Sequence, residues 1–145
     1  MANALKYGTT LRNNMLDEIE LRANAGTGAP KLQIFAHTTT PNVTAADGGT
    51  KLSEITLPAN FLTAAAGGTV SKTGTWSDAS ATASGNFKYF RIKTSGAGTG
   101  GNTTVVQGTA GLNTGTFDLE FDSASVTAGQ TVTVSTFVIT GGNGD

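Results

Sequence analysis

From Lys31 onward the chain consists of short apolar runs separated by turn residues, and this spacing limits the fold more than any other feature of the sequence. Apolar and polar residues alternate within the runs, as in β-strands, where successive side chains point to opposite faces. Glycine pairs such as Gly48-Gly49 and Gly67-Gly68 are typical of the turns between strands. The pattern predicts about seven strands, at Lys31–His37, Lys51–Leu57, Thr69–Trp76, Asn86–Lys93, Thr103–Gln107, Thr116–Phe121 and Thr131–Thr140.

Short strands at this spacing favour an all-β fold, namely an antiparallel β-sandwich or jelly roll with one short N-terminal helix. Only 13% of the residues are charged, and the net charge is −1. Disordered chains usually carry a high net charge, so the charge content favours an ordered domain. Threonine recurs along the chain, and β-branched residues suit strands.

One helix is predicted, from about Thr10 to Asn24, with Thr10 as its cap and Gly26 as its end. Leu21 falls on its polar side, whereas Arg12 and Arg22 fall within its apolar arc. At roughly 100° per residue, the apolar side carries Leu11, Met15, Leu16, Ile19 and Ala23, and the polar side carries Asn13, Asp17, Glu20 and Asn24.

We expect three segments: an N-terminal arm at residues 1–9, a single β-sandwich domain at residues 10–140 that includes the helix, and a flexible tail at residues 141–145. The arm carries Leu5 and Tyr7, and the helix carries Leu21 on its polar side. These three side chains are the candidate partner-interface residues. The alternative is that Leu5 and Tyr7 pack on the domain's own sheet and that Leu21 is an ordinary exposed leucine.

Side chains that perform catalysis are scarce. The chain has one histidine, His37, and no cysteine, which argues against thiolate chemistry and most zinc sites. No Gly-x-Ser-x-Gly sequence accompanies His37, so a Ser-His-Asp triad is not indicated. The glycines of Gly96–Gly101 match a dinucleotide-binding fingerprint by spacing, but a strand-forming stretch follows them where a phosphate-binding helix is needed. We therefore predict that the protein is not an enzyme and has no cofactor.

Three carboxylates, Asp118, Glu120 and Asp122, alternate along one predicted strand and share one of its faces. Calcium is bound by several carboxylate oxygens, so these residues are a candidate metal site. However, residues two apart on a strand lie about 6.6 Å apart, too far to chelate one ion without a loop. We expect a solvated face and no metal, with the core on the opposite face, made by Phe117, Leu119 and Phe121.

Neither nucleic acid nor membrane is an expected partner. Binding to phosphates needs a basic surface, and the chain is nearly neutral. No apolar run approaches the ~20 residues of a membrane span.

Five predicted strand and turn segments have sequences similar to those of a known protein family: Lys31–Phe35, Pro41–Gly49, Leu52–Leu57, Ala83–Ile92 and Ser125–Val132. Through these stretches and the strand order, most of the chain resembles a widespread family of small virion proteins of tailed bacteriophages, which are often encoded among head and tail genes. The resemblance carries over no catalytic or interface residue.

The resemblance implies a structural protein, a capsid decoration (cement) protein that binds the outside of an assembled phage head and stabilises the shell. A tail or head-tail connector protein is the alternative within the same class. The implied partners are the major capsid protein or other virion proteins, together with further copies of the chain in a homo-oligomer. The implied location is the capsid exterior, after synthesis in the host cytoplasm. A carbohydrate-binding module is the alternative function from another class. A glycan microarray and a virion-binding assay would distinguish it from a virion structural protein.

Overall fold

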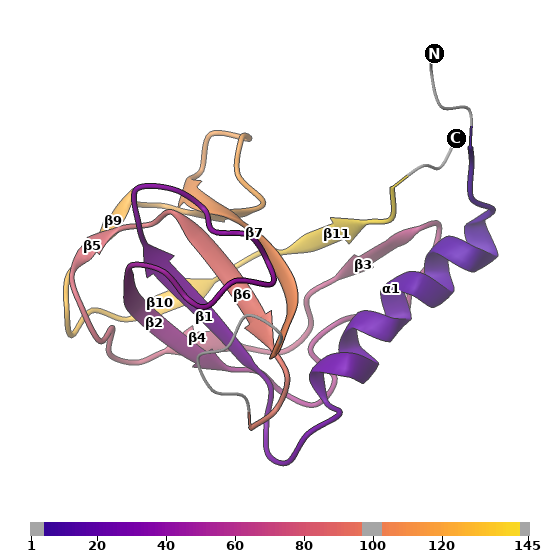
Figure 1. The fold of residues 1–145 in the computed structure, drawn as a ribbon, viewed down its shortest axis with the longest axis horizontal. Helices are drawn as coiled ribbons and strands as arrows, with labels where there is room; N and C mark the ends of the chain where they lie inside the picture. Colours follow the sequence, from indigo (N-terminus) through magenta and orange to yellow (C-terminus); the bar gives the residue numbers. More distant parts are fainter. Residues whose placement is uncertain (1–4, 97–102, 143–145) are drawn as a thin grey trace.

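The computed structural model describes residues 5–96 and 103–142 (Figure 1). The chain is mostly β with one short helix, as predicted. The outer parts of the predicted arm and tail, and most of the glycine tract after Gly96, lie outside the described residues. The described elements are α1 (Thr9–Ala23), β1 (Lys31–Ala36), β2 (Thr50–Thr56), β3 (Thr69–Ser71), β4 (Trp76–Asp78), β5 (Gly85–Asn86), β6 (Tyr89–Lys93), β7 (Thr104–Leu112), β8 (Leu119–Phe121), β9 (Ser125–Val126), β10 (Val132–Val134) and β11 (Val138–Thr140).

The largest unit is a curled, mixed sheet of five strands in the order β2-β1-β6-β7-β8. Neighbours are antiparallel except β7 and β8, which pair in parallel, with Ala110 beside Leu119. The prediction that all strands are antiparallel is therefore wrong for the pair β7 and β8. The physical reason is the Asp118 carboxylate, which accepts hydrogen bonds from the Thr109 amide and hydroxyl, both at 2.8 Å. These bonds bring the returning loop back beside the middle of β7, so that β8 runs in the same direction as β7.

The remaining strands form two-stranded sheets, β10-β4, β11-β3 and β5-β9. The first two sheets are parts of one interrupted ribbon, because the Lys72 amide donates a hydrogen bond to the Phe137 carbonyl (2.9 Å) between them. Between the two sheets, residues 72–75 lie opposite residues 135–137, so one side of the ribbon is one residue longer than the other. The longer side bends at Gly74, which has a φ of 68°. The prediction of about seven strands was too low because three predicted strands are each broken in two and because β9 was not foreseen.

The core lies between the five-stranded sheet and this ribbon. Trp76 is fully buried in β4, and its ring packs against the rings of Phe61 and Phe137 at centroid distances of 5.9 and 5.4 Å. Phe137 in turn meets Phe90 of β6 edge-on at 5.5 Å. Aromatic pairs with this spacing contribute beyond their buried area, so this group holds the ribbon on the sheet.

Helix α1 differs from its prediction at both ends. It begins at Thr9 after an extended Gly8, whose carbonyl accepts the first helical hydrogen bond, from the Arg12 amide (3.1 Å); no side chain caps the helix, because the residue at the cap position is a glycine. Thr10 therefore lies inside the first turn and cannot be the cap. Asn24 ends the helix, and Gly26 has another role: a Cβ at that position would collide with the Ser95 carbonyl oxygen.

The side of α1 predicted to be polar lies against the domain, although Asp17 on that side stays exposed. Residues 59–68 run beside the helix and present backbone amides that no strand pairs with. Polar side chains of α1 satisfy these groups, as backbone groups of a neighbouring strand would. The bonds run from Gly68 N to Asn13 Oδ1 (2.8 Å), from Ala65 N to Asp17 Oδ1 (2.8 Å), from Leu62 N to Glu20 Oε2 (2.7 Å) and from Asn24 Nδ2 to Ala59 O (2.8 Å).

Candidate docking surface

Docking by its polar side turns part of the apolar side of α1 outward. Leu11 and Met15 were predicted to face the core, but they are 49% and 54% exposed. Leu16 and Ala23 are buried as predicted, and Ile19 is half-buried. The two exposed residues lie one helical turn apart, so they form a short apolar stripe on the helix surface.

The three residues chosen from the sequence are not brought together within one chain. Leu5 is 56% exposed and Tyr7 is half-buried, both just before the helix begins. Leu21, at 65% exposed, lies on the opposite flank of α1 from Met15 and about 18 Å of helix beyond Thr9. The sequence therefore predicted exposed Leu21 correctly, but it missed Leu11 and Met15. Arg12 and Arg22, which interrupt the predicted apolar arc, were the sequence signal that could have indicated an exposed side.

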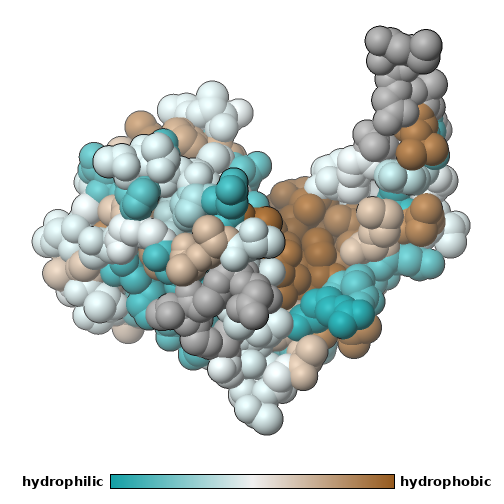
Figure 2. All heavy atoms as spheres, in the orientation of Figure 1, coloured by the Kyte–Doolittle hydropathy of each residue, from teal (hydrophilic) through white to brown (hydrophobic). Residues whose placement is uncertain are grey.

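Two hollows border the helix. An open groove of about 780 Å³ runs between the C-terminal half of α1 and residues 59–64, with Leu21 and Leu62 among its apolar lining and Asp17 and Glu20 as its charged groups. On the other flank, Figure 2 shows apolar surface gathered in the hollow between α1 and the body of the protein. Beside the body, a smaller cavity of about 240 Å³ is lined by apolar residues such as Val106 and Ile139 together with polar ones such as Asp118.

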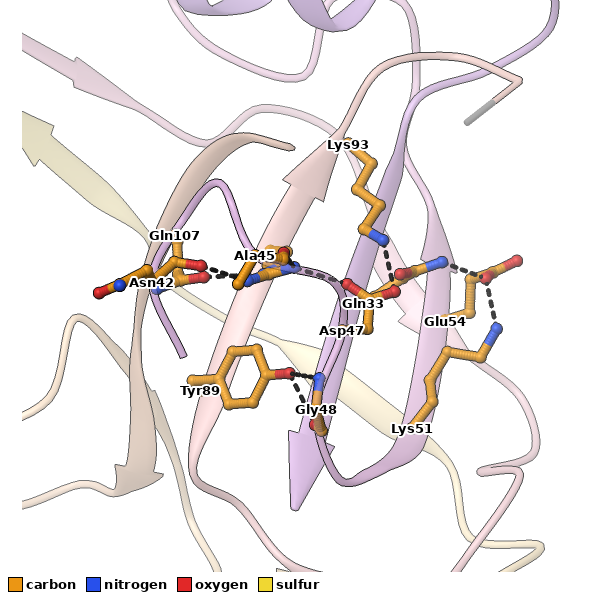
Figure 3. Close-up of polar contacts among 11 residues, drawn as sticks. Gln33, Asn42, Ala45, Asp47, Gly48, Lys51, Glu54, Tyr89, Lys93 and Gln107 are labelled. Carbon is orange, nitrogen blue, oxygen red and sulfur yellow. Dashed lines mark hydrogen bonds and ion pairs between the residues drawn. The ribbon is translucent and has the colours of Figure 1, made fainter. Parts of the chain in front are cut away.

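A dense group of polar side chains lies elsewhere, on the outer face of the sheet beneath the loop between β1 and β2 (Figure 3). Arg91 and Lys93 of β6 are fully buried there, and both bond to Asp47 of the loop, at 2.8 and 2.5 Å. The Arg91 guanidinium also donates to Gln107 and to the carbonyls of Ala45 and Asn42. The N–H donors of Arg91 thus attach the loop to the sheet, so this set of polar side chains has a structural role.

Tyr89 attaches the same loop from a position two residues before Arg91 on β6. Its hydroxyl donates to the Gly48 carbonyl (2.7 Å) and accepts from the Gly48 amide (3.0 Å), as Figure 3 shows. Burial raises the pKa of the phenol, and the hydrogen bond from Gly48 opposes this only in part. Tyr89 therefore stays neutral over the physiological pH range, as the bond that it donates to the Gly48 carbonyl requires. Gln33, on the neighbouring strand, donates to Glu54 (2.8 Å) and has an Oε1 atom without a partner among the described residues.

The other residues singled out from the sequence do not form a site. Phe117 is 39% exposed, so its predicted place in the core is wrong, whereas Leu119 and Phe121 are buried. Phe117 precedes β8 and packs over Gly111 of β7, outside the alternation of the strand. Asp118 is bonded to Thr109, and within residues 5–96 and 103–142 no three histidine or carboxylate side chains converge as a metal site would require. 

His37 is exposed, and its Nδ1 contacts the backbone of Thr39. In the described part of the chain, α1 is the only helix, and it is too short and too polar to cross a bilayer. Searches against protein-family models, curated proteins and solved structures find no match to this chain.

Proposed function

We propose that the protein is a structural component of a bacteriophage virion, and specifically a capsid decoration protein that binds the outside of the assembled head and stabilises the shell. The observation that carries the proposal is the outward apolar surface of the arm and α1, which includes Leu5, Leu11 and Met15. The helix that carries this surface is fixed to the domain through its polar side. A helix held in this way presents apolar side chains to a partner without being free to bury them against its own domain.

The size of this surface fits a weak contact that is repeated many times. A stable protein–protein interface usually engages roughly 20–30 residues on each side. The arm and the outward side of α1 expose only a few apolar side chains, so one such contact binds weakly by itself. A capsid offers the same contact on every copy of its shell protein, and a multivalent ligand gains affinity from simultaneous contacts. A tail or head-tail connector protein is the alternative, since it would also bind a repeated ring of subunits.

For the architecture we propose a β-sandwich, with the five-stranded sheet as one layer and the interrupted ribbon as the other. The aromatic group of Trp76, Phe137 and Phe90 supports this layering, because it joins the two across the core. A rigid two-layer body would suit a protein whose function is to hold a surface against a shell.

Co-sedimentation with purified phage heads that lack the protein tests the proposed function. The double variant Leu11→Ser/Met15→Ser should bind about thirtyfold more weakly, because each half-exposed side chain contributes on the order of 1 kcal/mol when it is buried. Val43→Ser is the matched control, since Val43 is 44% exposed on the loop between β1 and β2, away from the helix. Equal binding of the two variants would exclude α1 as the contact. Absence of the protein from purified virions, judged by mass spectrometry, would contradict the virion assignment itself.

A further inference from the structure

We infer that copies of this chain associate head to tail, with the arm of one copy, Leu5–Tyr7, seated in the groove between α1 and residues 59–64 of the next copy. This inference goes beyond the proposed function, because it concerns contacts between copies and not contacts with a shell; it assigns Leu5 to the neighbouring copy and leaves Leu11 and Met15 of the outward surface to the shell. It would also bring Leu5 and Tyr7 of one copy against Leu21 of another.

The groove has the chemistry of a site for an apolar segment that carries a positive charge. Leu21 is the most exposed large apolar side chain on its lip, and Leu62 is part of its lining. Its charged groups, Asp17 and Glu20, are both acidic. Each uses one carboxylate oxygen to accept a backbone amide of residues 62–65, and among the described residues the second oxygen has no hydrogen-bond partner. The groove is therefore acidic as well as apolar.

The arm has the complementary chemistry. Leu5-Lys6-Tyr7 places one cation between two apolar side chains, and Leu5 is 56% exposed. An extended segment of this kind could place Lys6 near the carboxylates and its neighbours along the apolar lining. Arg12 and Arg22, the other basic groups of this region, do not line the groove, and Arg22 is paired with Glu18 (2.5 Å).

The groove of the same chain is out of reach of its own arm. The described arm residues lead away from the N-terminal end of α1, whereas the groove begins at Leu16 and continues to Asn24 (Figure 1). Thr9 and Leu21 are separated by about 18 Å of helix. A second copy can supply the arm without this constraint. Because the contact joins two different surfaces, it can be repeated from copy to copy, as in a ring or a row.

The absence of cysteine from the chain permits a direct test by disulfide cross-linking. Full-length Leu5→Cys and Leu21→Cys proteins, carrying tags of different size, are mixed and oxidised, and the mixed dimer is measured on a non-reducing gel. Cysteine is itself a small apolar residue, so each substitution keeps part of the contact. The mixture should give more mixed dimer than Leu5→Cys paired with Val138→Cys, a control in which Val138 is 54% exposed on β11. Equal yields from the two mixtures would overturn the inference.

A charge reversal provides an independent measure. Lys6→Glu should weaken self-association, measured by sedimentation equilibrium, by about fivefold, since the substitution removes an exposed ion pair and brings a carboxylate beside Asp17 and Glu20. Lys88→Glu makes the same charge change away from both arm and groove, and it should leave association unchanged. A wild-type protein that stays monomeric at millimolar concentration, or equal effects of the two reversals, would overturn the proposed contact. Neither measurement involves phage heads, so this inference and the capsid assignment can fail separately.

Discussion

Replacing Asp47 by alanine tests whether the loop between β1 and β2 is held by buried charge. The Asp47 carboxylate contacts Arg91 Nη1 at 2.8 Å and Lys93 Nζ at 2.5 Å, and both basic side chains are completely buried. Asp47 itself is only 12% exposed. The substitution removes a shared acceptor from two cations that solvent cannot reach.

The expected loss of stability follows from this burial. Removing one partner of a buried ion pair costs about 3–5 kcal/mol, because an uncompensated charge stays inside the protein. Arg91 keeps its bonds to Gln107 and to two loop carbonyls, which limits the effect to this range. For a chain of this length each kcal/mol lowers the melting temperature by about 3–4 °C, so Asp47→Ala should melt roughly 10–20 °C below the wild type.

Differential scanning calorimetry or urea unfolding measures the loss, with Glu18→Ala as the matched control. Glu18 forms an ion pair with Arg22 at 2.5 Å, but both side chains are exposed, and its removal should cost less than about 0.5 kcal/mol. Asp47→Asn retains one acceptor oxygen and should fall between the two, which keeps the test usable if Asp47→Ala does not fold. The reasoning is refuted if Asp47→Ala unfolds within about 2 °C of Glu18→Ala.

Three further predictions concern single positions. Phe121→Ala should cost about 3–5 kcal/mol in urea unfolding and Phe117→Ala about 1 kcal/mol or less, because only Phe121 is buried; equal losses would mean that β8 faces the other way. Gly115→Ala should cost about 1–2 kcal/mol for its φ of 78°, and Gly49→Ala more, since Gly49 has a φ of 80° and a Cβ there would also collide with a carbonyl oxygen; thermal melts that rank them in reverse would contradict this. Burial opposes ionisation of Asp78, but hydrogen bonds from Ser53 Oγ and from two backbone amides outweigh it and hold the pKa of its carboxyl below the usual 3.8. The stability from this ionised group is present above pH 3.8 and lost as the pH falls through the lower pKa of the folded state, so Asp78→Ala should lose less stability than the wild type on acidification, measured as melting temperature against pH.

The alternation of apolar and polar residues along the sequence was sufficient to predict the positions of most strands and part of the core. The alternation in Lys31–His37 correctly placed Leu32 and Ile34 in the core, but Gln33 and Phe35 on the other face are buried as well. The rule of one buried face per strand therefore fails in β1, and it fails again in β6, where Tyr89 to Lys93 are all buried. One face of β6 meets the core and the other meets the loop that carries Asp47, and nothing in the spacing of the strand indicates that a distant loop will cover it.

The sequence by itself determined that the chain is β-rich with a short N-terminal helix, since runs of alternating residues and their turn signals depend on neighbours in the chain. Only the tertiary structure decided which side of that helix is inside. An amphipathic pattern predicts that the apolar side packs inward, but residues 59–68 leave backbone amides that need acceptors, and Asp17 and Glu20 provide them. Satisfying these exposed and partly buried backbone groups turned Leu11 and Met15 outward, because an amide left unpaired beside the helix costs more than an exposed apolar side chain.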